Sequence, residues 1–222
     1  MTQTSPGTVL FDMDGVLIDS HHCAHKILAK VAATYGITLS VADIRAMGSL
    51  SGAQFWRTLK QRYGLTPTVD ELQASYPVAD EIAQYAQLGL MPGIEQQLQQ
   101  LKNKGYQLGL VTSATRERVD AVLALLTDAD VFEVVISAED VSRHKPEPHC
   151  YHLALELMSA SSARSVAVED SANGAMAACL AGCKVIGFKS PQWADDPFAA
   201  NAFVDDFRHH DLLSTVEVVL RA

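Results

Sequence analysis

The sequence lacks any run approaching the roughly 18 uninterrupted apolar residues of a membrane-spanning helix. Residues 1–11 also lack a basic segment followed by an apolar one, so we expect no secretory signal peptide. Positive charge is in deficit, because 17 Lys and Arg residues stand against 26 Asp and Glu residues, for a net charge of −9. A nucleic-acid backbone demands a basic surface. These absences argue against membrane and nucleic-acid partners and favour a cytoplasmic protein.

Cysteine is scarce as well, with four scattered residues in a chain of 222. Cys179 and Cys183 are four apart on an expected helix, but no His pair at ligand spacing accompanies them. We therefore expect all four, which include Cys23 and Cys150, to be buried and reduced thiols. The acidic balance still permits a small anionic substrate, since one Lys and a divalent cation can reverse the local field.

One stretch stands out against this ordinary composition. Residues 8–20 read TVLFDMDGVLIDS, in which a short apolar run ends in Asp12, Met13, Asp14 and Gly15. Two carboxylates so close together at the end of a buried strand need a cation or a shared proton. A turn at Gly15 can direct both acids toward one crevice, although alone the pattern fits a solvated turn equally well.

Residues 20–88 predict a block of helices without a convincing strand. Apolar residues recur at spacings of three and four from 23 to 35, which is typical of an amphipathic helix. Asp19 or Ser20 is expected to cap this helix, and Gly36 to end it. Further helices are expected at 41–47, at 53–63 and, as one helix or two, at 70–88.

From residue 91 onward, the pattern alternates between helices and short apolar strands. A helix opened by Met91-Pro92-Gly93 and closed by Gly105 comes first. The expected strands are 107–111, 131–137, 165–168 and 184–188, and the expected helices between them are 116–126, 148–158 and 172–180. Such alternation predicts a parallel sheet with both faces covered. The predicted fold is α/β, with a Rossmann-like doubly wound core of residues 1–19 and 89–222 and a small inserted α-helical domain of residues 20–88.

Polar residues follow the later strands, at the edge where such sheets bind ligands. Thr112 and Ser113 precede a helix whose N-terminus suits a phosphate, although either could simply cap that helix. Lys145 stands before a proline that favours an extended backbone, a position that a solvated loop lysine also takes. Glu169 and Asp170 suit a hard cation such as Mg²⁺, with a capping Asp170 as the alternative.

Together these strand ends resemble the four motifs of the haloacid dehalogenase-like hydrolase superfamily, in its phosphatase and phosphomutase branch. The resemblance covers nearly the whole chain and includes a helical insert after the first motif. The matching residues are Asp12-x-Asp14-Gly15, Thr112, Lys145-Pro146, and Glu169-Asp170-Ser171 followed by Gly174.

The resemblance implies a role for each motif. Asp12 would be the nucleophile that forms an aspartyl-phosphate, and Asp14 the general acid and base. Mg²⁺ would be bound by Asp12, the backbone carbonyl of Asp14, Asp170 and Glu169, directly or through water. The substrate phosphate would be bound by Thr112, Ser113 and Lys145. The implied protein is a monomeric, Mg²⁺-dependent phosphatase for a small phosphorylated metabolite, with sugar phosphates favoured.

Two alternatives stay open. In a β-phosphoglucomutase-like enzyme, by offset from the first motif, a histidine of the insert would fall on Ala24, with His25 adjacent, and an arginine near Ser51. Ala24 and Ser51 both differ from the mutase pattern, which favours a hydrolase. A non-enzymatic phosphosugar-binding regulator is less compatible, because all four motifs keep their chemical groups. The second aspartate, Asp14, argues against the dehalogenase branch, and no pattern supports a Schiff-base lysine among Lys26, Lys30 and Lys60.

The insert resembles the mobile cap of this superfamily, which closes over the site and contacts the leaving group. Phe55 and Trp56 are expected in the core of the insert, and the Gly- and Ser-rich segment 48–52 is expected to be flexible. Candidate contacts to the leaving group are His21, His22, His25, Arg45, Gln54 and Arg57, each of which could equally be an exposed helix residue.

Overall fold

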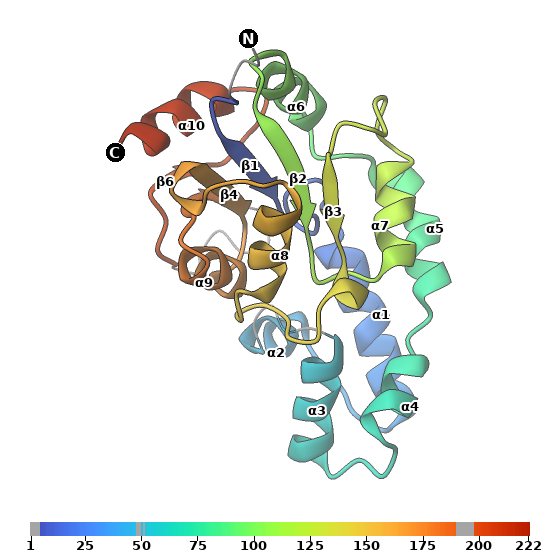
Figure 1. Ribbon diagram of the computed structural model, residues 1–222. Coiled ribbons are helices and arrows are strands. Elements are labelled where there is room, and N and C mark those ends of the chain that lie inside the picture. Colours follow the sequence, from blue (N-terminus) through green and yellow to red (C-terminus); the bar gives the residue numbers. More distant parts are fainter. Residues whose placement is uncertain (1–4, 48–49, 51, 190–197) are drawn as a thin grey trace.

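A computed structural model of the protein describes residues 5–47, 50, 52–189 and 198–222 (Figure 1). The strands are β1 (Thr8–Phe11), β2 (Gln107–Val111), β3 (Val134–Ile136), β4 (Ser165–Glu169), β5 (Lys184–Phe188) and β6 (Ala202–Val204). The helices are α1 (His21–Thr34), α2 (Val41–Ala46), α3 (Gly52–Tyr63), α4 (Val69–Ala74), α5 (Val78–Leu88), α6 (Ile94–Asn103), α7 (Arg116–Leu123), α8 (His149–Leu157), α9 (Ala172–Leu180) and α10 (Leu212–Arg221).

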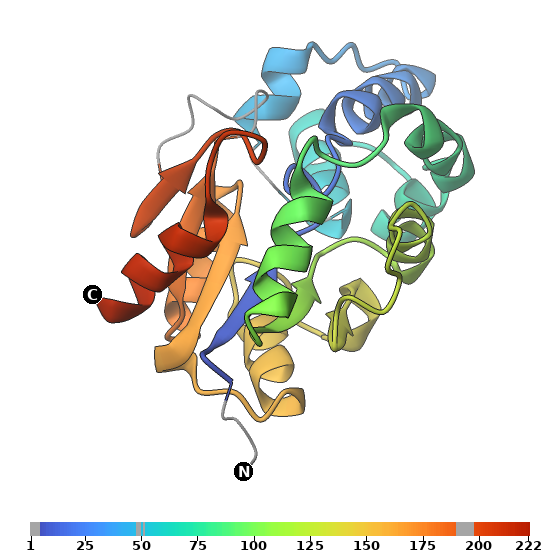
Figure 2. The same cartoon turned by 90° about the horizontal axis from the view of Figure 1, so that it is seen from above.

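The strands form one parallel sheet in the order β3-β2-β1-β4-β5-β6. Side chains alternate across it, because Val9 and Phe11 of β1 pack in the cluster that includes α6 and α10, whereas Leu10 packs in the one that includes α8 and α9. Figure 2 shows α6 in green and α10 in red over the same face of the sheet. Helices on both faces confirm the predicted Rossmann-like, doubly wound α/β fold.

Helices α1 to α5 form what we call the helical insert. Helices α1 to α4 pack around a hydrophobic cluster of their own, whereas Ile82 and Tyr85 of α5 pack in the cluster that includes α6 and α10. Phe55 and Trp56 are buried in the cluster of α1 to α4, with their rings edge-to-face at 5.2 Å, which confirms their expected place. The insert meets the rest of the chain where α5 packs against α7 (Figure 1). Within the described residues, no helix combines the length and apolar character needed to cross a membrane.

Several predicted boundaries are wrong. The helix expected at 116–126 ends at Leu123, because tighter turns then carry Leu126 into the core. The strand expected at 131–137 pairs only over 134–136, since Val131 and Phe132 pack into the core instead. The expectation of one helix or two at 70–88 is confirmed, because the range forms two, with Pro77 at the N-cap of the second, where its missing N–H is tolerated. Of the segment 48–52, residues 48, 49 and 51 lie outside the described residues.

The C-terminal elements β6 and α10 were not predicted. β6 has only three residues, and Phe203 at its centre is exposed, so the strand carries no readable pattern. The four cysteines are free thiols, of which Cys23, Cys150 and Cys183 are buried as expected. The prediction is wrong for Cys179, which is exposed because α9 turns its Ala175 and Ala178 toward the sheet instead.

Candidate active site

The candidate site lies where the strand order reverses. The chain places β2 and β3 on one side of β1 and β4 on the other, so the reversal falls between β1 and β4. Ligands bind at the carboxyl ends of strands at such a point. Phe11 pairs with Val168, and the Asp12 N–H donates to the Val168 carbonyl at 3.0 Å. The first and last predicted acid motifs, at Asp12 and Glu169, are therefore brought side by side.

Gly15 makes this approach feasible. Its φ of +81° lies in the left-handed region that favours glycine, and its N–H donates to the Ile18 carbonyl at 2.8 Å. A Cβ on Gly15 would overlap the Asp170 carboxylate and crowd Nε2 of His21. The position thus requires glycine both for its backbone and for the close contact between the β1 turn and the end of β4.

Lys145 is the buried cation of the site. Its Nζ donates to Oδ1 of Asp12 at 2.9 Å, to Oε1 of Glu169 at 2.6 Å and to the Val111 carbonyl at 2.9 Å. The peptide bond between Lys145 and Pro146 is cis. These contacts tie the ends of β1, β2 and β4 together and make a solvated loop lysine the wrong interpretation.

The buried charges shift one another's pKa. Burial raises the pKa of Asp12 to about 6, against the opposing effect of Lys145. Burial and the neighbouring Asp12 raise the pKa of Glu169 to about 8, again opposed by Lys145. Burial lowers the pKa of Lys145, but Asp12 and Glu169 more than offset this and raise it overall. The cluster therefore needs more positive charge than one lysine supplies if all its acids are to be ionised.

The acids fit a divalent cation. Asp12, Glu169 and Asp170 are buried, and each offers an oxygen within 4.8 Å of the others. Oε1 of Glu169 accepts from Tyr151, whereas its Oε2 is buried without a hydrogen-bond partner in the described part of the chain. Gly174 leaves room for this carboxylate, which a Cβ there would overlap. Buried carboxylate oxygens in excess of positive charge are the ligand set that suits Mg²⁺.

Thr112 and Ser113 follow the end of β2 and line the cavity described below. Thr112 is buried, and its Oγ1 accepts from the Ala114 N–H at 3.0 Å. Neither residue caps α7, because the N-cap position belongs to Thr115. The capping alternative is therefore wrong for both. The carboxyl ends of β1, β2 and β4 thus bring Thr112 and Ser113 to the same site as Lys145 and the acids.

The Asp14 side chain does not join the acid cluster. Its Oδ1 accepts from the Ser20 hydroxyl and from Nη2 of Arg118 at 2.8 Å. Ser20 occupies the N-cap position of α1, as expected. Its side chain makes no capping hydrogen bond to the helix, so that part of the expectation is wrong. Buried Oδ1 of Asp19 has no hydrogen-bond partner among the described residues, so Asp19 is not that cap either.

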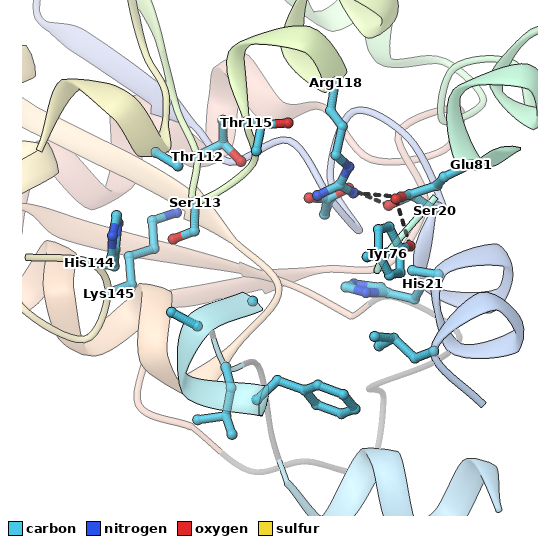
Figure 3. A pocket seen from close by; sticks show the side chains of 18 of the residues that line it. Ser20, His21, Tyr76, Glu81, Thr112, Ser113, Thr115, Arg118, His144 and Lys145 are labelled. Atoms are coloured by element: carbon cyan, nitrogen blue, oxygen red, sulfur yellow. Dashed lines mark hydrogen bonds and ion pairs between the residues drawn. The ribbon is translucent and has the colours of Figure 1, made fainter. Parts of the chain in front are cut away.

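Arg118 joins Asp14 to the helical insert, and Figure 3 shows its side chain reaching Glu81. Its Nη2 also donates to Oε1 of Glu81 on α5 at 2.8 Å, and its Nε donates to the Tyr85 hydroxyl at 2.8 Å. The Tyr76 and Tyr85 hydroxyls donate to Glu81, which is buried. This network is not predicted from the sequence, because Arg118 and Glu81 lie at helix positions whose charges are typical of a solvated face.

A cavity of about 350 Å³ opens over these groups. One wall comes from the strand ends, and the other comes from the helical insert, including Leu28, Ile44, Phe55, Trp56 and Val78. Of the predicted contacts, His21 and His25 line the cavity, whereas His22 and Arg57 are exposed elsewhere and Gln54 does not line it. The Arg45 side chain lies outside what the structure describes. Nε2 of His21 lies 2.8 Å from Oδ2 of Asp170, a contact that joins the insert to β4.

Among the described residues that line the cavity, Lys145 is the only lysine. Lys26 and Lys30 are exposed, and Nζ of Lys60 donates to the carbonyls of Leu65, Thr66 and Pro67. Because Lys145 is bound to two carboxylates, a Schiff-base lysine has no support in this part of the chain.

A doubly wound sheet with buried polar groups at its switch point is typical of α/β enzymes that bind their ligand at the strand ends. The chain belongs to the haloacid dehalogenase-like hydrolase family, whose pattern matches residues 9–188. This confirms the predicted superfamily and agrees with a phosphoric monoester hydrolase.

Relatives and solved structures point the same way. Validoxylamine A 7′-phosphate phosphatase of Streptomyces hygroscopicus subsp. limoneus is 30% identical over 89% of this chain and 92% of its own. Phosphoglycolate phosphatase of Shigella boydii is 32% identical over 81% and 79%. The crystal structure of CbbY from Rhodobacter sphaeroides in complex with phosphate has a TM-score of 0.81 at 24% identity, over 91% and 95% of the two chains. This last likeness concerns the fold.

Proposed function

We propose that the chain is a Mg²⁺-dependent phosphatase that hydrolyses a small phosphorylated metabolite, a sugar phosphate by preference, through an aspartyl-phosphate at Asp12. The observation that carries this proposal is the placement of Asp12. Its carboxylate is buried at the switch point, 2.9 Å from Nζ of Lys145, and lines the cavity with Thr112 and Ser113. Relatives named as phosphatases for small phosphorylated compounds support the substrate class.

In the first step, an oxygen of Asp12 bonds to phosphorus and the bond to the ester oxygen breaks. Asp14 donates a proton to that leaving oxygen. Lys145 offsets the negative charge, and the Thr112 and Ser113 hydroxyls hold phosphoryl oxygens. In the second step, water attacks phosphorus, Asp14 takes its proton, and Asp12 is released with inorganic phosphate.

Asp12, Glu169, Asp170 and the backbone carbonyl of Asp14 would hold Mg²⁺, which when bound supplies positive charge that keeps Asp12 ionised and offsets the charge of the phosphoryl oxygens. The proposal assigns the metal to these groups because they are buried, rich in oxygen and short of positive charge.

The proposal assigns residues 20–88 to a cap over a core of residues 1–19 and 89–222. Two features support this division: α1 to α4 share a hydrophobic cluster of their own, and the cavity lies between the insert and the strand ends. A cap so placed would exclude water and contact the leaving group.

Hydrolysis is preferred to phosphomutase chemistry. Ala24, where the mutase pattern would have a histidine, lines the cavity and offers no polar group, although His25 beside it lines the cavity too. Ser51, near the expected arginine, lies outside the described residues. Solved relatives of the fold include a β-phosphoglucomutase from Clostridium difficile, at 18% identity and a TM-score of 0.81, so fold alone does not separate the two reactions.

The test is phosphate release from a panel of small phosphate esters, with Mg²⁺ or with a chelator. Wild type should release phosphate only with Mg²⁺, and Asp12→Asn should fold normally but lose turnover. Glucose 6-phosphate formation from β-glucose 1-phosphate is followed in parallel. Substantial turnover by Asp12→Asn would refute the assignment of the nucleophile, and rapid isomer formation with little phosphate release would make the enzyme a mutase.

A further inference from the structure

The guanidinium of Arg118 is held at three points. Nε donates to the Tyr85 hydroxyl, and Nη2 donates to both Asp14 and Glu81, each at 2.8 Å. Tyr85 and Glu81 belong to α5 of the helical insert, whereas Arg118 belongs to α7 of the sheet domain. A planar guanidinium with donors fixed in a fork keeps its orientation when several partners hold it. The insert therefore sets where Arg118 meets Asp14.

The Asp14 carboxyl is held in one orientation by two hydrogen-bond donors. Arg118 and the Ser20 hydroxyl both donate to the same oxygen, Oδ1. A carboxylate held at one oxygen by a cation and a hydroxyl is fixed in rotation. Its proton is then exchanged at Oδ2, and the carboxyl belongs to the wall of the cavity.

Arg118 and Glu81 are costly residues to bury. The Glu81 side chain is 1% exposed and that of Arg118 is 17% exposed. Removing two charges from water offsets much of what their pairing contributes, so a well-packed apolar pair would hold α5 against α7 equally well. Arg116, on the same helix, differs from Arg118 in its surroundings. It pairs with Asp140 at 2.7 Å on the surface, away from the cavity.

We propose that Arg118 is a positioning residue: held by Glu81 and Tyr85 of the insert, it fixes the Asp14 carboxyl so that Oδ2 meets the leaving oxygen of the substrate. This inference rests on the proposed phosphatase reaction. It makes the acid dependent on the packing of α5 against α7. Figure 3 shows the Arg118 side chain reaching from α7 to Glu81, beside Ser20.

The test compares leaving groups. The alcohol oxygen of an alkyl phosphate must receive a proton as it leaves, whereas the p-nitrophenolate of p-nitrophenyl phosphate leaves without one. Arg118→Gln should lower kcat/KM by about 10²-fold for an alkyl phosphate, the lower range of acid–base effects, and by less than about tenfold for p-nitrophenyl phosphate. Asp14→Asn should show the same dependence on the leaving group, more strongly. The matched control, Arg116→Gln, should behave as wild type with both substrates.

A folding defect has its own control. Arg118→Gln leaves Glu81 buried without its cation, so Arg118→Gln with Glu81→Gln removes both charges and restores a neutral pair. This double variant should keep the melting temperature of wild type and the leaving-group dependence of Arg118→Gln. Equal losses with both substrates, or no loss in either variant, would overturn the positioning role while leaving the phosphatase intact. Failure of wild type to release phosphate from any ester with Mg²⁺ would instead overturn the proposed function.

Discussion

The two walls of the cavity are built differently. The wall from the strand ends concentrates charge, with Lys145 bound to Asp12 and Glu169 at hydrogen-bond distance. The wall from the helical insert is largely apolar and includes Phe55 and Trp56. If the proposed function holds, the charged wall carries the reaction and the apolar side chains of the insert select the leaving group, while Glu81 and Tyr85 of the insert act on Asp14 through Arg118. Substitutions in the charged wall should abolish the reaction, whereas those in the apolar wall should change stability and substrate preference.

The largest effect is expected in the charged wall, at Lys145. Replacement by Met removes the cation from two buried carboxylates, so Lys145→Met should lose detectable turnover. Its free energy of unfolding, measured by urea titration with a chelator present, should fall by about 3–5 kcal/mol.

The control is Lys102→Met, which breaks the exposed pair with Asp128 and should cost at most about 1 kcal/mol. Equal effects of the two substitutions would show that the buried lysine contributes no more to stability and turnover than a surface lysine.

The charged wall could be predicted from the sequence, because parallel strands end at one edge whatever the distance between them in the chain. Asp12 directly follows β1, and Lys145, 133 residues further on, lies in the segment between β3 and α8. The partnership of Arg118 with Glu81 and Asp14 could not be predicted in this way. Helical periodicity shows which face of α5 or α7 is apolar, but not which helices pack together, so a buried arginine and a solvated one look alike.

In the apolar wall, the largest effect is expected at Trp56. The side chain is 1% exposed, so Trp56→Ala should lower the free energy of unfolding by about 3–5 kcal/mol through lost burial and the resulting cavity. The variant should still hydrolyse p-nitrophenyl phosphate at a temperature where it stays folded.

Tyr63→Ala, on the same helix but 41% exposed, should change stability by less than about 0.5 kcal/mol. Complete loss of turnover in folded Trp56→Ala would show that the apolar wall is needed for the reaction as well as for stability.

A smaller effect on stability is expected from Mg²⁺, which should bind the acids of the charged wall and not the apolar wall. Mg²⁺ at about 100 times its dissociation constant should raise the free energy of unfolding by about 2.7 kcal/mol, because only the folded state assembles the three acids. Thermal denaturation with and without Mg²⁺ measures this. Asp170→Asn should lose the increase, and Tyr63→Ala should keep it. An undiminished increase in Asp170→Asn would remove Asp170 from the metal site.

The proposed reaction depends on transfer of the phosphoryl group to Asp12. Wild type mixed with a phosphate ester that it hydrolyses, in the presence of Mg²⁺, is quenched in acid within milliseconds, digested and analysed by mass spectrometry. We expect one added phosphoryl group on the peptide that contains Asp12, located at Asp12 rather than Asp14, and absent from Asp12→Asn. A phosphoryl group on any other residue, or turnover with no phosphorylated enzyme at any quench time, would contradict it.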